Sequence, residues 1–166
     1  AKRTGTGCRK CGGREMVETR EARLEDLEGL NRLYLQLSGN DHGLSSRYKD
    51  IFAQMKSDSA YHLLVAVNED NNVVGSVLGI ICKSLAAHYE SFLVIEDVIV
   101  DDTLRRAGIG RALFEKIEQI ASENSCAYSI LVSSGFRTEA HRFYENMGYT
   151  ESVVGFRKKL MTSDTL

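Results

Sequence analysis

The run FLVIEDVIV at residues 92–100 is the feature that most limits how this chain can fold. A strand that is apolar at almost every position is buried on both faces, which places it near the centre of a covered sheet. A polar segment with two glycines follows at 101–111, and the helix after it has an apolar stripe from Ile109 to Ile120. The sequence therefore predicts a strand–loop–helix unit at the core of a layered α/β fold.

The remaining elements are predicted from apolar periodicity and turn signals. Period-two alternation indicates strands, spacing of three and four indicates helices, and Asn, Asp and Gly clusters mark turns. In chain order we expect a strand at 16–22, helices at 24–38 and 45–57, a hairpin turning at 69–72, a strand at 127–132, a helix at 138–146 ended by Gly148, and final strands at 149–154 and 155–160. Together they predict a single α/β (α+β) domain with a mixed, mostly antiparallel central sheet and helices on both faces.

Charge is unevenly distributed along the 166 residues. The chain has 21 basic and 23 acidic residues, but residues 1–15 hold five basic residues against Glu15 alone, so the rest carries a net charge of −6. We expect this glycine-rich segment to be a flexible basic tail outside a domain at 16–166. A net charge of −6 argues against a nucleic-acid partner, because phosphate neutralisation needs a basic face. It favours a cationic substrate.

Apolar runs and cysteines indicate the compartment. The chain has no run of 18 apolar residues and no apolar signal-peptide core near its start, so we expect no membrane partner. Cys82 and Cys126 lie in apolar strand-like runs, where cysteine is usually a small buried hydrophobe. We therefore expect a reduced, cytoplasmic setting. Cys8 and Cys11 form a C-x-x-C without a second ligand pair, and we expect no metal site and no redox role there.

The segment at 101–111 has the composition of an anion-binding turn. Arginines flank the pair Gly108 and Gly110 where a helix begins, and the first N–H groups of a helix have no partner within it. Glycines let such amides approach a phosphate closely. A dinucleotide fingerprint would need a third glycine where Leu113 stands, and the P-loop pattern is also absent. The alternative is an ordinary glycine-containing turn with solvated arginines.

Two motifs in order distinguish these alternatives. Arg105–Gly110 matches R/Q-x-x-G-x-G/A after a strand, and Ala140–Tyr149 matches A-x-x-F/L-Y-x-x-x-G-F/Y. Both motifs, and the order of elements over residues 16–160, resemble the GNAT superfamily of acyl-CoA-dependent N-acetyltransferases. The resemblance implies a GNAT-like domain in which the strand at 92–100 forms a splayed parallel pair with the next strand.

The resemblance also implies acetyl-CoA as the cosubstrate and a place for it. Backbone groups at the end of the 92–100 strand would bind the pantetheine arm, much as an added strand would. Loop amides would hold the pyrophosphate, and an amide near Val98 would polarise the thioester carbonyl. The binding residues implied in this way are Val98, Ile99, Val100, Arg105, Arg106, Ala107, Gly108, Ile109, Gly110, Arg111 and Tyr144.

Two catalytic side chains are implied as well, and alternatives to both stay open. Tyr144 matches the frequent general acid of the family, which would protonate the departing CoA thiolate. The alternative is a tyrosine on the apolar face of its helix. Glu96 is the candidate base, because an ammonium group of pKa about 10.4 must lose a proton before it attacks. Strand parity groups Glu96 with Val98 and Val100 and turns its rival Asp97 to the other face. Such a polar pair could instead bind a cation without proton transfer.

The predicted function is transfer of an acetyl group from acetyl-CoA to a primary amine of a small molecule or peptide. Direct attack in a ternary complex is expected, because no Cys or Ser has the base partner of a covalent nucleophile. The alternative is a domain that binds acyl-CoA without turnover, as a sensor or interaction module; a tyrosine at position 144 favours the enzyme. The net charge favours a cationic acceptor. Dimers are common in the family, so a homodimer is a further expectation.

Overall fold

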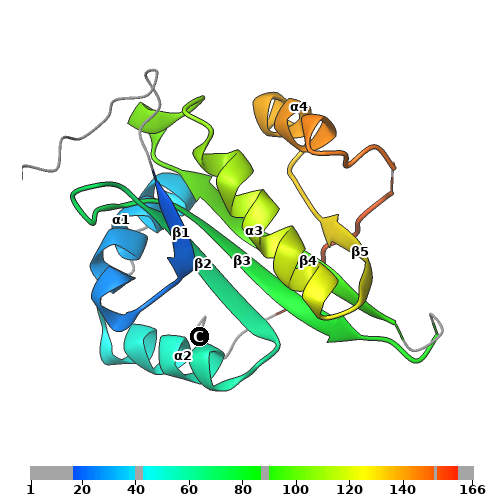
Figure 1. The fold of residues 1–166 in the computed structure, drawn as a ribbon, viewed down its shortest axis with the longest axis horizontal. Coiled ribbons are helices and arrows are strands. Elements are labelled where there is room, and N and C mark those ends of the chain that lie inside the picture. The colour runs from blue at the N-terminus through cyan, green and yellow to red at the C-terminus, as the bar shows by residue number, and fades with distance from the viewer. Residues whose placement is uncertain (1–16, 40–42, 87–89, 152, 161–166) are drawn as a thin grey trace, which may run out of the picture. The chain divides into compact units, whose positions relative to one another are not determined.

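The computed structural model describes residues 17–39, 43–86, 90–151 and 153–160, which belong to two compact units (Figure 1). The first unit runs to Leu131, and the second begins at Val132. The first contains β1 (Glu18–Glu21), α1 (Leu27–Ser38), α2 (Ser46–Ser57), β2 (Tyr61–Val67), β3 (Val73–Lys83), β4 (Ser91–Val100), α3 (Ile109–Glu123) and β5 (Cys126–Leu131), and the second contains α4 (Thr138–Asn146). Among the described helices, none has both the length and the apolar character needed to cross a bilayer. The expected tail at 1–15, with Cys8 and Cys11, lies outside the described residues.

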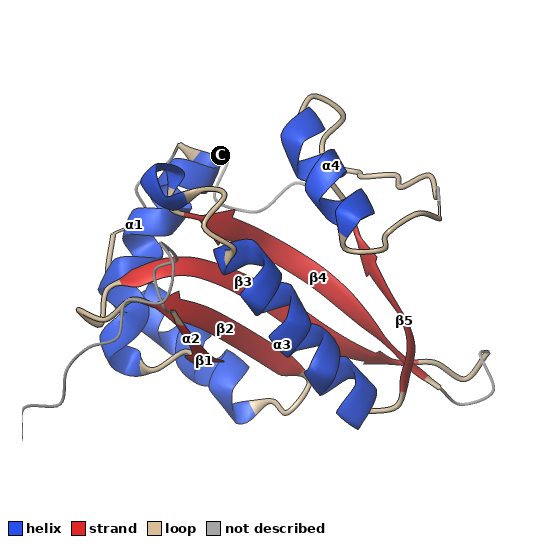
Figure 2. Ribbon diagram, turned by 45° about the horizontal axis from the view of Figure 1, so that its top comes forward, coloured by secondary structure: helices blue, strands red, loops and turns tan. Residues whose placement is uncertain are grey.

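The five strands form one mixed sheet in the order β1-β2-β3-β4-β5 (Figure 2). Neighbours from β1 to β4 run antiparallel, whereas β5 runs parallel to β4. β4 therefore pairs on both edges along its first half, where Leu93 and Ile95 are buried. The predicted mixed, mostly antiparallel sheet with a parallel strand pair is confirmed.

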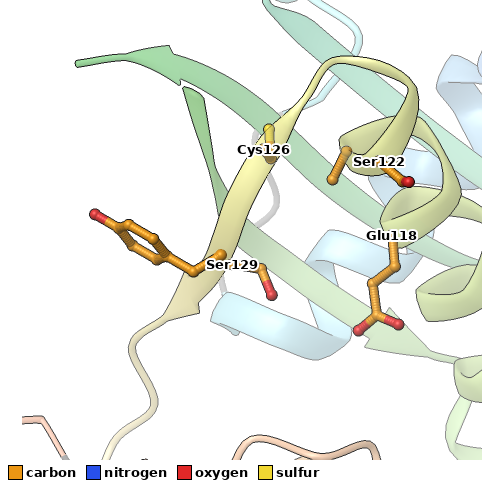
Figure 3. A pocket seen from close by; sticks show the side chains of 6 residues that line it. Glu118, Ser122, Cys126 and Ser129 are labelled. Atoms are coloured by element: carbon orange, nitrogen blue, oxygen red, sulfur yellow. The ribbon is translucent and has the colours of Figure 1, made fainter. Parts of the chain in front are cut away.

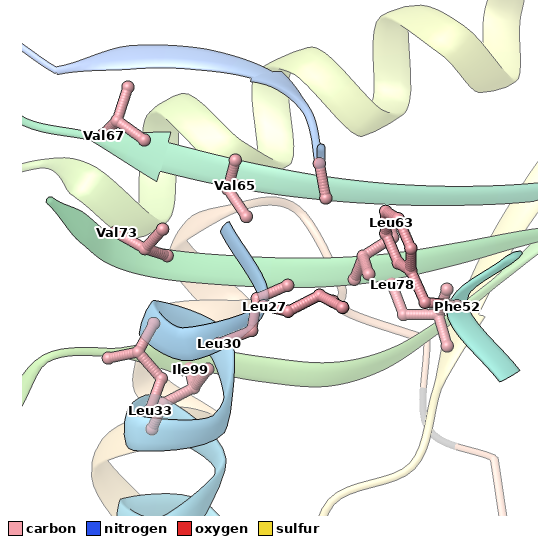
Figure 4. Packing of buried hydrophobic residues seen from close by; sticks show 11 residues of the cluster. Leu27, Leu30, Leu33, Phe52, Leu63, Val65, Val67, Val73, Leu78 and Ile99 are labelled. Carbon is pink, nitrogen blue, oxygen red and sulfur yellow. The ribbon is translucent and has the colours of Figure 1, made fainter. Parts of the chain in front are cut away.

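Two helices cover one face of this sheet. In α1, Leu27 and Leu30 lie on the apolar stripe that the spacing of the sequence predicted, Leu33 is buried as well, and in α2 Phe52 is buried. These side chains pack with Val65 and Leu78, which project from the strands, in one apolar cluster (Figure 4). Burial of this stripe, more than helix propensity, holds two short helices in place.

α3 covers the opposite face, and glycines of β3 let it lie close to the sheet (Figure 1). A Cβ at Gly75 would stand 2.9 Å from Cγ2 of Ile109, and one at Gly79 would stand 2.5 Å from Cδ1 of Ile117. Both contacts are shorter than van der Waals separation, so strand glycines mark the close approach of another element here. The predicted helices on both faces are confirmed.

Gly29 brings α1 into direct contact with β3. A Cβ at this position would lie 2.7 Å from Cβ of Val73, which the strand backbone holds in place. Alanine favours a helix over glycine by about 1 kcal/mol. We nevertheless expect Gly29→Ala to lower the free energy of unfolding by about 1–3 kcal/mol, because the added methyl group overlaps Val73. Thermal unfolding measures the change, with Gln54→Ala at an exposed position of α2 as the control. A Gly29→Ala protein as stable as the wild type would contradict this packing.

The predicted pair of C-terminal strands is wrong for the described residues. Residues 149–151 and 153–160 form no strand, and Val154 and Phe156 are 80% and 96% exposed. Their apolar alternation is typical of a strand, but a two-stranded hairpin is only marginally stable without further strands or a helix to pack against. The helix before them is confirmed as α4, and Gly148 follows it with φ of +98°, as expected for a helix-ending glycine.

Candidate active site

A bulge in β4 shapes the candidate site. In the pairing of β3 with β4, Leu78 lies opposite Glu96 and Ser76 lies opposite Ile99, so β4 has one residue more than β3 over this stretch. Asp97 lies inside it with φ of +50°, a left-handed conformation that is uncommon for a residue with a side chain. A bulge of this kind bends the strand and leaves the extra residue outside the ladder.

The bulge reverses the alternation of side chains, so the predicted parity is wrong. Glu96 pairs with Leu78, which belongs to the apolar cluster under α1 and α2. Val100 pairs with Gly75, whose Cβ would point at α3. Glu96 and Val100 therefore face opposite sides of the sheet, although an even number of positions separates them. The sequence contains no local signal for the extra residue at Asp97.

The charge of Asp97 in this bulge acts on Glu96 and on two tyrosines, Tyr34 of α1 and Tyr48 of α2. Burial raises the pKa of Asp97, and burial together with the charge of Asp97 raises the pKa of Glu96. Burial also raises the pKa of Tyr34 and Tyr48, and the charge of Asp97 adds to both shifts. Tyr34 Oη lies 3.4 Å from Ser76 Oγ. The charge of Asp97 thus reaches both helices that cover this face of the sheet.

The electrostatics of the pair suit proton exchange. Both carboxyl side chains keep access to solvent. A raised pKa brings a carboxylate closer to the pH at which it both accepts and releases a proton efficiently. Tyr34 and Tyr48 were not predicted as site residues, because the spacing of the helix at 24–38 assigns Tyr34 to the apolar stripe.

The second half of β4 extends beyond its parallel neighbour. The pairing of β4 with β5 ends at Ile95 opposite Leu131, while β4 continues to Val100. Within the first unit, β4 therefore continues beyond the last residue of β5. This stretch begins next to the bulge, and the predicted binding residues Val98, Ile99 and Val100 all lie on it.

The loop after β4 ends in an open helix N-terminus. Arg106 and Gly108 have φ of +68° and +90°, and Gly108 is the N-cap residue of α3. The first helical bond of α3 runs from Ala112 N–H to Gly108 O at 3.1 Å. A Cβ at Gly108 would meet no atom within 4 Å, so the glycine is needed for its backbone conformation and not for space. The segment thus leads into the positive end of the α3 dipole and the N–H groups of its first turn, the features on which the prediction of an anion cradle depends.

The arginines beside this cradle have weak internal partners. Arg105 forms an ion pair with Asp102, and Arg111 Nη1 lies 3.7 Å from Glu115 Oε1. All four side chains are more than half exposed. Exposed ion pairs contribute about 0–1 kcal/mol each, so either arginine can exchange its partner for a phosphate at little cost.

Tyr144 belongs to the second unit. It is 8% exposed, and its ring makes edge contacts with the rings of Phe143 and Tyr149 at centroid distances of 5.6 and 6.4 Å. Its backbone oxygen accepts a hydrogen bond from Tyr149 N–H at 3.0 Å. These contacts fix the ring of Tyr144 within this unit. A general acid needs a fixed ring, because its hydroxyl has to point in one direction.

A pocket in the first unit contains none of the predicted residues. It lies between the second half of α3 and β5 and is lined by Glu118, Ala121, Ser122, Cys126, Tyr128 and Ser129 (Figure 3). Burial and the neighbouring Cys82 raise the pKa of the Cys126 thiol, which keeps it protonated and unreactive at neutral pH. Within the described ranges, no three His, Cys, Asp or Glu side chains are arranged to hold a metal ion.

Comparison with known proteins identifies the family. A sequence profile of the Acetyltransferase (GNAT) family matches residues 39–149. The aminoalkylphosphonate N-acetyltransferase of Salmonella typhimurium is 27% identical over 148 residues, which are 87% of this chain and 92% of that protein. Two similar solved structures are a transcriptional regulator from Bacillus halodurans (TM-score 0.82, 26% identity) and an acetyltransferase from Trypanosoma brucei (TM-score 0.77, 27% identity), each covering 87% of this chain and 100% of the other. Since the profile matches most of the chain, from α2 to the end of α4, this protein belongs to the Acetyltransferase (GNAT) family.

Proposed function

We propose that residues 16–166 transfer an acetyl group from acetyl-CoA to a primary amine of a small molecule, in one step within a ternary complex. The observation that carries this proposal is the arrangement at the end of β4. A stretch of β4 that extends beyond β5, a bulge with two carboxyl groups and the N-terminus of α3 all lie within one unit. The stretch of β4 suits the amides of pantetheine, the carboxyl groups suit an ammonium group, and the helix N-terminus suits a pyrophosphate.

The residues at the end of β4 and in the loop fit coenzyme A. Amides of Arg106–Arg111 would bind the pyrophosphate, because Gly108 holds the left-handed conformation that opens the first turn of α3. Backbone groups of Val98–Val100 would pair with the amides of pantetheine, since β4 continues past the last residue of β5.

Proton transfers would accompany both the attack of the amine and the departure of the thiolate. Glu96 would take a proton from the bound ammonium group, directly or through water, and the free amine would attack the thioester carbonyl carbon. The carbon–sulfur bond then breaks, and the Tyr144 hydroxyl would protonate the departing thiolate. The attacking nitrogen would release its remaining extra proton, which would restore the Tyr144 hydroxyl directly or through water. Asp97 is the alternative base. In either case the second carboxylate attracts the positive charge of the acceptor, which favours a cationic amine.

The proposed acceptor class is supported by a relative and by the carboxyl pair. The Salmonella relative is named for aminoalkylphosphonates, which are small molecules with a primary amine. A thiol-release assay with acetyl-CoA and a panel of aminoalkylphosphonates, amino sugars, polyamines and lysine peptides tests the proposal. We expect turnover with at least one small amine. Turnover with lysine peptides alone would contradict the substrate class.

A second candidate is an acyl-CoA-binding regulator without turnover. It is favoured by the likeness to a structure described as a transcriptional regulator. Calorimetric titration with CoA, run beside the assay, separates the two functions. Binding without turnover by any amine would favour the regulator, and absence of CoA binding would contradict both.

Gly108→Ala tests the cradle directly. An alanine in the left-handed region costs about 1–2 kcal/mol, so we expect the loop to change conformation and the Kd for CoA to rise by about tenfold. Gly43→Ala is a matched control, because Gly43 also has positive φ, at +59°, and open space around its Cβ. It should leave CoA affinity unchanged. Equal losses of affinity in the two variants would point to general destabilisation and contradict a cradle at Gly108.

A further inference from the structure

Two side chains of α1 reach the segment that leads into the coenzyme loop. Arg32 Nη2 donates a hydrogen bond to Val73 O at 2.8 Å. Gln36 Oε1 accepts one from Asp102 N–H at 3.2 Å, across 66 positions of sequence. Both hydrogen bonds join α1, which packs over the sheet, to the end of the sheet at which β3 begins and β4 ends. Neither residue belongs to the sequence motifs at 105–110 and 140–149.

The residue that Gln36 contacts begins a tightly held turn. Asp102–Leu104 is a 3-10 turn with Asp101 as its N-cap residue. Asp101 N–H donates to Val74 O at 2.9 Å, and Asp101 Oδ1 accepts from Thr103 N–H and Thr103 Oγ1 at 3.0 and 2.7 Å. The Thr103 bonds hold the pKa of Asp101 below its ordinary value, and a bond from Gln36 adds to this. Gln36 therefore contacts both the cap residue and the first residue of the turn.

A helical turn leaves its first N–H groups without internal partners. The N–H of Asp102 is one of these groups, and a side chain from a distant helix satisfies it. This turn ends at Leu104, so it sets the position of Arg105 and of the left-handed residues Arg106 and Gly108 that follow it. On the same helix, Tyr34 lies beside Ser76, and its pKa is raised by burial and by the charge of Asp97. One helix thus reaches the start of the coenzyme loop and also carries a tyrosine whose pKa responds to the charge of Asp97.

We infer that Gln36 is a positioning residue for coenzyme A: it holds the turn at Asp101–Leu104 so that the loop at 105–108 is ordered before the ligand binds. This inference rests on the proposed function. Ordering a loop in advance improves affinity by reducing the entropy lost on binding. Gln36 acts through Asp102 and is not expected to touch the ligand.

Gln36→Ala should weaken CoA binding without unfolding the protein. A hydrogen bond of this kind contributes about 0.5–1.5 kcal/mol, so we expect the Kd for CoA, measured by calorimetry, to rise about three- to tenfold. Amide exchange at Asp102 should become faster, and the melting temperature should stay close to that of the wild type. With any acceptor that supports turnover, KM for acetyl-CoA should rise and kcat should stay. Gln119→Ala is the matched control, since Gln119 is also an exposed helical glutamine with a side-chain hydrogen bond, to Glu123.

Asp102→Pro provides the decisive comparison. Proline has no N–H to satisfy, its fixed φ suits the first residue of a helical turn, and Asp101 already has the extended ψ of 129° that a following proline requires. In the Asp102→Pro background, Gln36→Ala should therefore change CoA affinity by less than twofold. An equal effect of Gln36→Ala in both backgrounds would overturn the inference, as would unchanged affinity in Gln36→Ala alone. If the wild-type chain binds no CoA, the proposed function itself fails, which is a different result.

Discussion

Tyr144→Phe is expected to lower kcat by about 10²- to 10⁴-fold, the range that a positioned general acid contributes, while leaving CoA binding nearly unchanged. The physical reason is that a thiolate leaving group has to be protonated as the carbon–sulfur bond breaks. Phenylalanine keeps the edge contacts with Phe143 and Tyr149 and removes only the hydroxyl. The thiol-release assay and a CoA titration measure the two effects separately.

The matched control for this variant is Tyr128→Phe. Tyr128 is half exposed and stacks on Phe92 at a centroid distance of 5.2 Å, so it also loses only a hydroxyl. Its kcat should equal that of the wild type. If Tyr144→Phe retained full activity, Tyr144 would be a packing residue of α4 and the acid would have to be another group.

Glu96→Gln is the second large effect that we expect, a fall in kcat of about 10²-fold or more. Glutamine has almost the same shape but cannot accept a proton from the ammonium group. Glu123→Gln, near the far end of α3, is the control for the loss of one carboxylate. If Asp97→Asn abolished turnover while Glu96→Gln retained it, the two roles would be exchanged and Asp97 would be the base.

The pH dependence of kcat/KM tests the same assignment of Glu96 as the base. Because burial and the charge of Asp97 raise the pKa of Glu96, the carboxyl group stays protonated to higher pH than an ordinary glutamate. A protonated carboxyl group cannot act as the base, so kcat/KM should rise with pH as Glu96 ionises. Asp97→Asn removes the neighbouring charge and should move this rise to lower pH. A rise that stays in place would contradict the coupling of the two groups.

Elements with strong local signals were predictable from the sequence. The run at 92–100, the stripe from Ile109 to Ile120 and the cap at Ser45 each specify an element through residues close together in the chain, and the structure contains β4, α3 and α2 at these places. Ser45 caps α2 through its side chain, which accepts from Tyr48 N–H. The strands expected at 149–160 were wrong because their apolar alternation was the only signal, and a strand also needs a partner with which to pair.

The sequence by itself determined the strands up to β5, the helices, the glycine turn before α3 and the family, because periodicity, capping and the backbone freedom of Gly108 are properties of neighbouring residues. The tertiary structure decided the chemistry around β4. Only the register between β3 and β4 reveals the extra residue at Asp97, which reverses the facing of Val100 relative to Glu96. The contacts of Tyr34 with Ser76 and of Gln36 with Asp102 join residues 42 and 66 positions apart. Such contacts follow from how α1 packs on the sheet, and no local pattern in the chain encodes them.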